Sequence, residues 1–273
     1  MNAKVWLAIP LLIAGARNAG GLAAKTALAN ALQGTQASAV VLDSRTGVVL
    51  ATIGNLPRDT PGSAIKPLLL SYALEHGIVH PETEVYCRRN LKVGSLSLPC
   101  THPQDQKVFT AENALAESCN TWFAVMAQRF SGPQLEAALR YIRLSHVSMV
   151  NADVEQRQLA VLGLRGVTAS PIELALAYRD LVERLPATGP VAQGLRDSVS
   201  YGMAHPAAVT GLTILGKTGT ASNAGEAWTH GWFAGSLPGR FVLVVYVPHG
   251  DGGTAARLAQ KFFVAVTAER RSK

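Results

Sequence analysis

The strongest constraint on the fold is the distribution of strand and helix patterns, with strands at both ends of the chain and helices between them. Apolar runs rich in β-branched residues cover residues 37–43, 48–53, 212–217, 229–235 and 240–247. The short polar segment between the first two runs predicts a hairpin. Strands from both ends share one antiparallel sheet most simply when the middle folds as a separate lobe. We therefore predict an α+β fold: an antiparallel sheet flanked by helices, with a mostly helical lobe (about residues 61–205) inserted.

Caps and breakers predict where helices begin in this middle stretch. Pro67 has no N–H and is tolerated only in a first helical turn, so a helix must begin close to Ser63. Ser170-Pro171-Ile172-Glu173 combines an N-cap, a proline at the first position and a capping-box glutamate. Apolar periodicity predicts further helices at residues 110–115, after Asn120, at 133–144 and after Gly252-Gly253. A cleft between the two lobes would be the natural place for a site.

The N-terminus has the layout of a secretory signal peptide. Lys4 precedes the apolar run from Val5 to Ala14, and Ala14-Gly15-Ala16 fits a cleavage site of small residues. We predict that residues 1–16 direct export to the periplasm or another extracytoplasmic face, and that residues 17–273 form one domain. The run is short for a membrane span. Cleavage of the segment and its retention at the inner membrane both stay open.

The cysteines are compatible with an oxidising compartment. A bridge between Cys87 and Cys100 would close a short loop worth about 3 kcal/mol and would leave Cys119 over. The alternative is three unpaired thiols. No Cys/His spacing matches a common zinc site, so the sequence predicts no metal and no cofactor. The net charge of +7 is scattered without a basic block, which argues against nucleic-acid binding.

The first of three polar clusters is Ser63-Ala64-Ile65-Lys66. A serine needs a base to become a nucleophile, and a lysine one turn later faces the same side of the helix. Such a lysine is a base only when neutral. Its pKa must therefore fall from about 10.4 through burial or through a nearby positive charge, which Lys217 would supply. The competing interpretation is an N-cap serine followed by a solvated lysine.

The other two clusters are Ser118-Cys119-Asn120 and Lys217-Thr218-Gly219-Thr220. Between two helical stretches, the hydroxyl of Ser118 can relay a proton and the amide of Asn120 can hold a substrate carbonyl. The third cluster ends a predicted strand, where its glycine admits a substrate backbone and its threonines offer hydroxyls to a carboxylate. The Thr220 N–H would help to bind an oxyanion. An interhelical turn and an edge strand with a protective lysine are the competing interpretations.

Residues 211–218 also satisfy the P-loop pattern G-x-x-x-x-G-K-T. A P-loop follows a buried strand and opens a helix whose N–H groups bind phosphate. Here residues 212–215 are themselves strand-like, and no helical pattern follows Gly219. Nucleotide binding is therefore disfavoured.

The residues around the clusters resemble the transpeptidase domains of penicillin-binding proteins, in the serine D,D-peptidase and β-lactamase superfamily. Pro61-Gly62-Ser63-Ala64-Ile65-Lys66-Pro67 is similar to their Pro-Gly-Ser-x-x-Lys-Pro block, and Glu117 to Phe123 to their Ser-Cys-Asn-x-aromatic-Phe block. Residues 167–175 resemble their Val-Thr-Pro-x-x-Leu-Ala helix, although the proline after the threonine is missing. Residues 230–235 and 250–256 look like their last strands and turn. The resemblance extends from about residue 37 to the C-terminus.

The resemblance implies that Ser63 attacks the D-Ala-D-Ala end of a peptidoglycan stem peptide. D-Ala would leave, and an amine (D,D-transpeptidase) or water (D,D-carboxypeptidase) would resolve the acyl-enzyme. β-Lactams would acylate the same serine. By the same resemblance Lys66 is the base, Ser118 the proton relay and Asn120 a substrate contact, and Lys217-Thr218-Gly219-Thr220 binds the carboxylate and the oxyanion.

Two other functions fit the same serine. A serine β-lactamase would need a dedicated deacylation base, and no Glu-x-x-Leu-Asn block lies between Ser118 and Lys217. A non-catalytic sensor of β-lactams or muropeptides would acylate only once. Because no glycosyltransferase or dimerisation module precedes the resemblance, we expect a stand-alone domain. Such a domain would trim peptides or cross-link them with a partner protein from wall synthesis.

Overall fold

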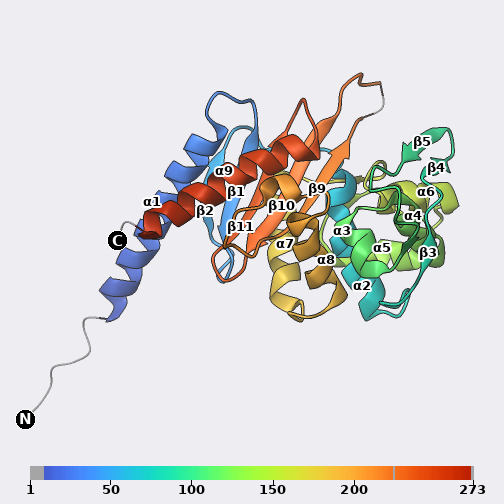
Figure 1. Cartoon of the computed structure of the whole chain (residues 1–273), viewed down its shortest axis with the longest axis horizontal. Coiled ribbons are helices and arrows are strands. Elements are labelled where there is room, and N and C mark those ends of the chain that lie inside the picture. Colours follow the sequence, from blue (N-terminus) through green and yellow to red (C-terminus); the bar gives the residue numbers. More distant parts are fainter. Residues whose placement is uncertain (1–8, 224, 272–273) are drawn as a thin grey trace, which may run out of the picture.

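A five-stranded antiparallel sheet forms the centre of the protein, as seen in a computed structural model that describes residues 9–223 and 225–271. The strand order is β2-β1-β11-β10-β9, so strands from the two ends of the chain are neighbours (Figure 1). This confirms the predicted sheet. The strands are β1 (Ser38–Asp43), β2 (Val49–Ile53), β9 (Leu215–Ala221), β10 (His230–Leu237) and β11 (Phe241–Val247).

Burial on both faces explains why the central strands are almost continuously apolar. Every residue of β10 and of β11 is buried. Because side chains alternate along a strand, Val40 and Val244 face one core, whereas Val41 and Val245 face the other. The register that pairs Ser38 with Tyr246 at one end of β1 fixes this division.

Helices cover both faces of the sheet. α1 (Ile9–Leu32) and α9 (Gly252–Arg271) pack on one face, where Leu28 and Phe262 are fully buried against the strands. α7 (Pro171–Arg184) packs on the opposite face against β1, β10 and β11. Figure 1 shows α9 crossing the sheet beside α1, with α7 against the sheet and α2 to α6 gathered beyond β9.

The predicted helices of the middle stretch are present. The nucleophile candidate lies in a 3₁₀ turn, η1 (Gly62–Ile65), which continues into α2 (Lys66–Glu75). The helices expected after Thr110 and Asn120, near Pro133 and after Ser170 are also found. The other middle elements are α3 (Ala111–Ala116), α4 (Asn120–Arg129), α5 (Gly132–Tyr141), α6 (Val154–Val161), α8 (Pro190–Ser200), η2 (His205–Ala207), β3 (Val85–Tyr86), β4 (Asn90–Val93), β5 (Leu96–Pro99), β6 (Val108–Phe109), β7 (Ser145–His146) and β8 (Val167–Thr168).

Both boundaries of β9 differ from the prediction, and two helices were not predicted. β9 begins at Leu215 rather than at Leu212, and it continues through the third cluster instead of ending at Lys217. The reason is its pairing with β10, which extends from Leu215 to Ala221, whereas Leu212 lies in a turn. Helices α6 and α8 were not predicted, although the Asp153 capping box and Pro190 mark their starts.

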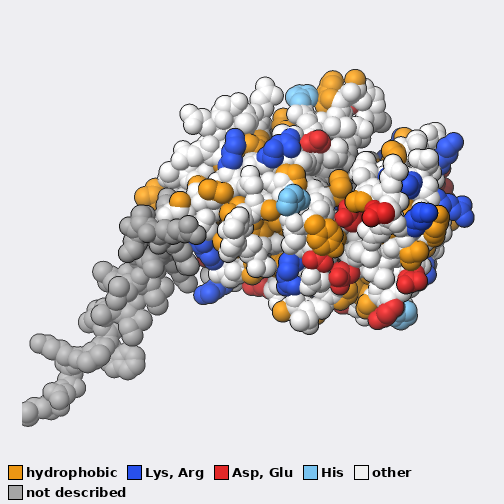
Figure 2. All heavy atoms as spheres, viewed as in Figure 1, with side chains coloured by type: hydrophobic (Ala, Val, Ile, Leu, Met, Phe, Trp, Pro, Cys, Tyr) orange, Lys and Arg blue, Asp and Glu red, His pale blue; other side chains and the backbone are white. Residues whose placement is uncertain are grey.

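The predicted signal peptide lies partly outside the described residues, which begin at residue 9. Residues 9–16 belong to α1, a helix that continues through the predicted cleavage site to Leu32. Among the described residues, no helix combines the length and apolarity needed to cross a membrane. On the face drawn in Figure 2, basic and acidic side chains are interspersed over the surface.

Candidate active site

The turn that carries Ser63 places it on the same side as Lys66. The backbone N–H of Lys66 donates to the Ser63 carbonyl, as a 3₁₀ turn requires, and residues three apart eclipse one another in such a turn. Pro67 occupies the second helical position, where its missing N–H costs nothing. The predicted relation between these residues and the helix start is therefore confirmed.

Buried aromatic side chains hold the segment that leads into this turn. The Thr60 carbonyl accepts hydrogen bonds from Trp232 Nε1 at 2.9 Å and His230 Nε2 at 2.8 Å, both from β10. The Tyr178 hydroxyl of α7 donates to the Ala64 carbonyl at 2.7 Å. Ser63 is thus fixed between a central strand and a long helix. These contacts join residues more than 100 positions apart, so the local motifs alone do not reveal them.

Two glycines allow the third cluster to lie directly against the Ser63 turn. A Cβ built on Gly219 would stand 2.3 Å from the Pro61 carbonyl oxygen and 2.9 Å from Ala64 N. A Cβ on Gly62, whose φ is +52°, would stand 2.6 Å from the Thr220 carbonyl oxygen. Only residues without a side chain fit this contact. Strand β9 and the Ser63 turn are therefore packed backbone to backbone.

Lys66 joins the first cluster to the second. Its Nζ donates to the Ser118 carbonyl at 2.9 Å, to Ser118 Oγ at 3.2 Å and to Asn120 Oδ1 at 2.8 Å. It also lies 4.9 Å from the centre of the Phe123 ring. Ser118 has a φ of 56°, a left-handed conformation that costs energy for a residue with a side chain. The interhelical turn is held in this conformation with both polar side chains toward Lys66.

Both lysines are completely buried, and this changes their protonation. Burial lowers the pKa of Lys66 to about 8, against the opposing effect of the nearby Cys119 and Cys100. Burial also lowers the pKa of Lys217 well below its ordinary value, and repulsion from Lys66 adds to this, while Glu117 opposes it. Because the two amines repel each other in a desolvated site, the pair favours a single positive charge near neutral pH.

The structure decides between two expected causes of the lowered Lys66 pKa. The sequence interpretation named burial and the positive charge that Lys217 would supply. In the structure burial is the largest cause of the lowered pKa of Lys66. The repulsion between the two amines acts mainly on the pKa of Lys217. The reason is that Lys66 starts a helix packed inside the core, which the local sequence pattern does not reveal.

The threonines of the third cluster project from the face of β9 opposite to Gly219. Thr218 Oγ1 donates to the Met203 carbonyl at 3.4 Å, and Thr220 Oγ1 accepts from Gly252 N at 2.9 Å. Thr220 is exposed and keeps its hydroxyl proton for a further partner. Asn120 Nδ2 lies 3.4 Å from the Pro99 carbonyl oxygen. The P-loop alternative is excluded, because Gly216, Lys217 and Thr218 are all strand residues.

The predicted bridge between Cys87 and Cys100 is wrong. Within the described residues, all three cysteines are free thiols and all are buried. The sulfur atom next to Cys100 belongs to Cys119, at 4.0 Å, because the turn of the second cluster brings that residue to the same place.

The assembled site combines three chemical capacities. It offers a serine at the start of a helix, a buried amine of lowered pKa bonded to a second serine, and a second buried amine on an adjoining edge strand. The serine can act as a nucleophile, the amines can accept or hold a proton, and the helix start can stabilise an oxyanion. This is the equipment needed for acyl transfer through a covalent intermediate.

Comparisons with known proteins agree with this geometry. The family model of the penicillin binding protein transpeptidase domain matches residues 37–267. A D,D-transpeptidase domain of a peptidoglycan glycosyltransferase from Eggerthella lenta superimposes with a TM-score of 0.79 at 18% identity, over 92% of this chain and 82% of that one. The transpeptidase domain of penicillin-binding protein 3 from Burkholderia pseudomallei gives a TM-score of 0.75 at 19% identity, over 94% of each chain.

A chain from a peptidoglycan synthase complex that coordinates polymerization and crosslinking is also similar. Its TM-score is 0.72 at 21% identity, over 90% of this chain and 59% of that one. At these identities the likeness to solved structures shows the fold. No curated protein sequence matches the chain.

Proposed function

The chain belongs to the penicillin-binding protein transpeptidase domain family, and from that premise we propose that it is a serine acyltransferase acting on D-Ala-D-Ala stem peptides. The family as a whole comprises acyl-transferring enzymes of peptidoglycan synthesis. The observation that carries the finer proposal is the completely buried Lys66, with a pKa lowered to about 8 and hydrogen bonds to Ser118 and Asn120.

The proposed first step is attack by Ser63 Oγ on the carbonyl carbon of the penultimate D-Ala. The hydroxyl proton passes to neutral Lys66, and the oxyanion is stabilised by backbone N–H groups at the start of η1 and from Thr220. The C–N bond then breaks. Ser118 relays a proton from Lys66 to the leaving nitrogen, so that D-Ala departs as a neutral amine and Lys66 is ready again.

We propose that the substrate itself sets the protonation of the two lysines. The stem peptide ends in a carboxylate, and a carboxylate beside Lys217 favours the charged form of that amine. Since the pair favours a single positive charge, the proton at Lys217 leaves Lys66 neutral and able to act as the base. Thr220 and Asn120 would complete the binding of the carboxylate and of the peptide carbonyl, and Thr218 would join them by exchanging its long hydrogen bond to the Met203 carbonyl for one to the substrate.

The same acyl-enzyme could serve a transpeptidase, a carboxypeptidase, a β-lactamase or a sensor, and its lifetime discriminates among them. We expect a fluorescent penicillin adduct to persist for hours. An adduct that is hydrolysed within seconds would instead identify a serine β-lactamase. D-Ala release from a pentapeptide stem would then identify an enzyme, and its absence a sensor. Adding a second stem peptide as acceptor distinguishes the cross-linked product from simple hydrolysis.

We also propose that the protein works outside the cytoplasmic membrane, where stem peptides are cross-linked. The support is the family and the apolar N-terminal run. A partner from wall synthesis is proposed because a similar domain occurs in a peptidoglycan synthase complex. Fractionation of cells that express the full chain tests the location. Recovery of the protein in the cytoplasm would contradict it.

A further inference from the structure

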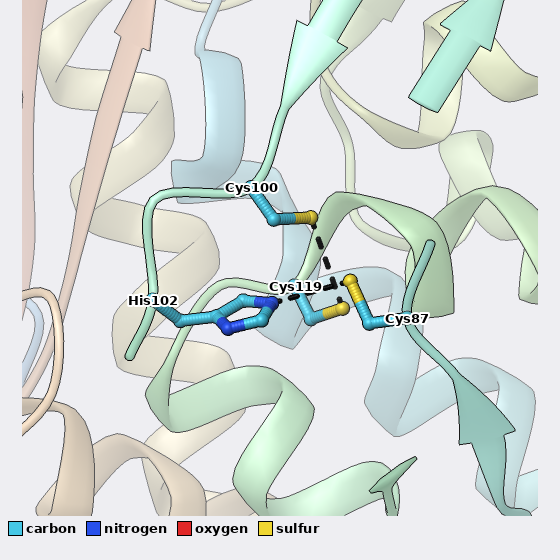
Figure 3. Close-up of side chains that lie close together, drawn as sticks. All are labelled: Cys87, Cys100, His102 and Cys119. Atoms are coloured by element: carbon cyan, nitrogen blue, oxygen red, sulfur yellow. Dashed lines mark hydrogen bonds between the residues drawn. The ribbon is translucent and has the colours of Figure 1, made fainter. Parts of the chain in front are cut away.

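Beside the lysine pair lies a cluster of four side chains that the proposed acyl transfer does not use. Cys87, Cys100, His102 and Cys119 are all buried, and their sulfur and nitrogen atoms lie within 4.8 Å of one another. Figure 3 shows the four side chains converging from separate segments: after β3, after β5 and just before α4.

We propose that Cys87, Cys100, His102 and Cys119 bind a structural zinc ion that fastens the turn carrying Ser118 and Asn120. Three thiolates and one imidazole form a common ligand set of closed, four-coordinate zinc sites. Since the protein fills all four positions, none is left for water or substrate. The ion would therefore support the structure and take no part in the chemistry.

The distances are close to those of a tetrahedral site. Bonds of about 2.3 Å to sulfur and about 2.0 Å to nitrogen put two sulfur ligands about 3.8 Å apart, and sulfur and nitrogen about 3.6 Å apart. Here Cys100 Sγ and Cys119 Sγ are 4.0 Å apart, and Cys87 Sγ and His102 Nε2 are 3.2 Å apart. All the ligand atoms lie within 4.8 Å of one another, so side-chain shifts of up to about 1 Å would complete the geometry.

The surroundings of His102 prepare its ring for a metal ion. Nδ1 lies 3.0 Å from the Pro103 carbonyl oxygen, which can only accept, and 3.4 Å from Arg89 Nη1, which can only donate. The shorter contact favours the proton on Nδ1. Nε2 then has a free lone pair and points at the sulfur atoms. A ring N–H donated to a backbone carbonyl is the usual outer-shell partner of a metal-bound histidine.

A backbone donor lies against one of the thiols, because Arg89 N donates to Cys87 Sγ at 3.3 Å. The Arg89 guanidinium donates to the Cys100 carbonyl at 3.3 Å, so the same residue also holds the backbone of a second cysteine. A donor to sulfur stabilises the thiolate that binds zinc. Cys87 also lines a surface pocket with Arg89 and Lys107, which gives an ion a way in.

A disulfide is the competing use of these thiols, and the cluster argues against it. A bridge between Cys100 and Cys119, whose sulfur atoms are 4.0 Å apart, would leave Cys87 and His102 buried with only each other as partners. The zinc ion uses all four groups. The sequence expectation of no metal depended on the absence of a Cys/His spacing that matches a common zinc site, whereas the fold brings Cys87 and Cys119 from other parts of the chain to Cys100 and His102.

The ion would act on the proposed chemistry through Cys119. This residue lies between Ser118, whose backbone is left-handed, and Asn120, and both neighbours bond Lys66. Lys66 holds one side of the turn, and the metal would hold the other. These four residues are therefore proposed as positioning residues for the relay serine, and this part of the inference rests on the proposed function.

The first test measures metal in the full chain purified after expression with added zinc. We expect about one zinc per chain, three free thiols after denaturation and chelation, and thiolate-to-metal charge transfer in the cobalt-substituted protein. His102→Ala should lose the zinc, whereas the matched control His80→Ala, an exposed histidine elsewhere, should keep it. His102→Cys should restore binding, because four cysteines also bind zinc. Protein without zinc, a disulfide, or unchanged binding in His102→Ala would overturn the proposal.

The second test asks what the metal does for acylation. Removing zinc with a chelator should slow acylation by penicillin about 10–100-fold, and adding zinc back should restore the rate. An unchanged rate in metal-free protein would overturn the positioning role. If zinc binds but no form of the protein acylates, the proposed function fails while the metal site stands. If the protein acylates without ever holding zinc, the metal site fails and the function stands.

Discussion

The contact between Gly219 and the Ser63 turn gives a sharp prediction for the substitution Gly219→Ala. The added Cβ would stand 2.3 Å from the Pro61 carbonyl oxygen and 2.9 Å from Ala64 N. Non-bonded heavy atoms of this kind normally stay more than about 3.3 Å apart, so strand and turn must separate by about 1 Å. The neighbouring atoms are backbone, held by Trp232 and Tyr178, and cannot swing aside.

A displacement of this size would move the proposed nucleophile away from β9, the strand proposed to bind the substrate. Misplacement by about 1 Å can cost about 100-fold in rate, which corresponds to about 2.7 kcal/mol in the activation free energy. Overpacking should also lower the free energy of unfolding by about 1–3 kcal/mol. We therefore expect a folded protein with a moderately lower melting temperature and an acylation rate about 100-fold below that of the original chain.

The assay is the second-order rate of acylation by a fluorescent penicillin, with circular dichroism to follow unfolding. Gly21→Ala is the matched control, because the nearest atom to its added Cβ is Leu50 Cδ2 at 4.0 Å. In helix α1 this change should leave the rate unaltered and favour the helix by about 0.5–1 kcal/mol. If Gly219→Ala folds and acylates at the original rate, the close packing of β9 on the turn has no part in the reaction.

Three further predictions concern the base, its protonation and the fold. Lys66→Ala should abolish acylation while circular dichroism stays native, and ordinary reactivity would refute the assignment of the base. With a pKa of about 8 for Lys66, its neutral fraction rises from roughly 10% at pH 7 to roughly 90% at pH 9. The acylation rate should therefore rise about ninefold over this range, and a flat or falling profile would contradict a neutral amine as base. Ser170→Ala removes the N-cap of α7 and should cost about 1 kcal/mol, or about 2–4 °C in melting temperature, whereas the exposed Ser200→Ala should change little.

Local signals made much of the fold predictable from the sequence. Pro67 limits the helix start to within a few residues, and the Ser170 capping box satisfies its own N–H groups, so both boundaries follow from short-range chemistry. The start of β9 could not be predicted in this way. Leu212 and Ile214 have the apolar pattern of a strand and pack against one core of the sheet, but they precede the strand. There the pairing with β10, a long-range contact, decides the boundary.

The candidate site was also predictable only in part from the sequence. Ser63 and Lys66 are one helical turn apart, so the sequence alone predicts that they share one side of the helix. The structure then places Ser118 and Asn120 within hydrogen-bond distance of the Lys66 amine. Burial and the charge of Lys217 were both expected causes of the lowered Lys66 pKa, but the larger effect of burial was not predictable, because burial depends on packing from the whole middle stretch. The thiol and imidazole cluster was missed for the same reason: its members come from segments that only the tertiary fold brings together.

The most direct test of the account is the position of the covalent penicillin adduct. Mass spectrometry of the proteolysed adduct should find the acyl group on the peptide that contains Ser63, and Ser63→Ala should carry none while keeping its native circular dichroism. An adduct on any other residue, or an undiminished adduct in Ser63→Ala, would contradict the assignment of Ser63 as the nucleophile.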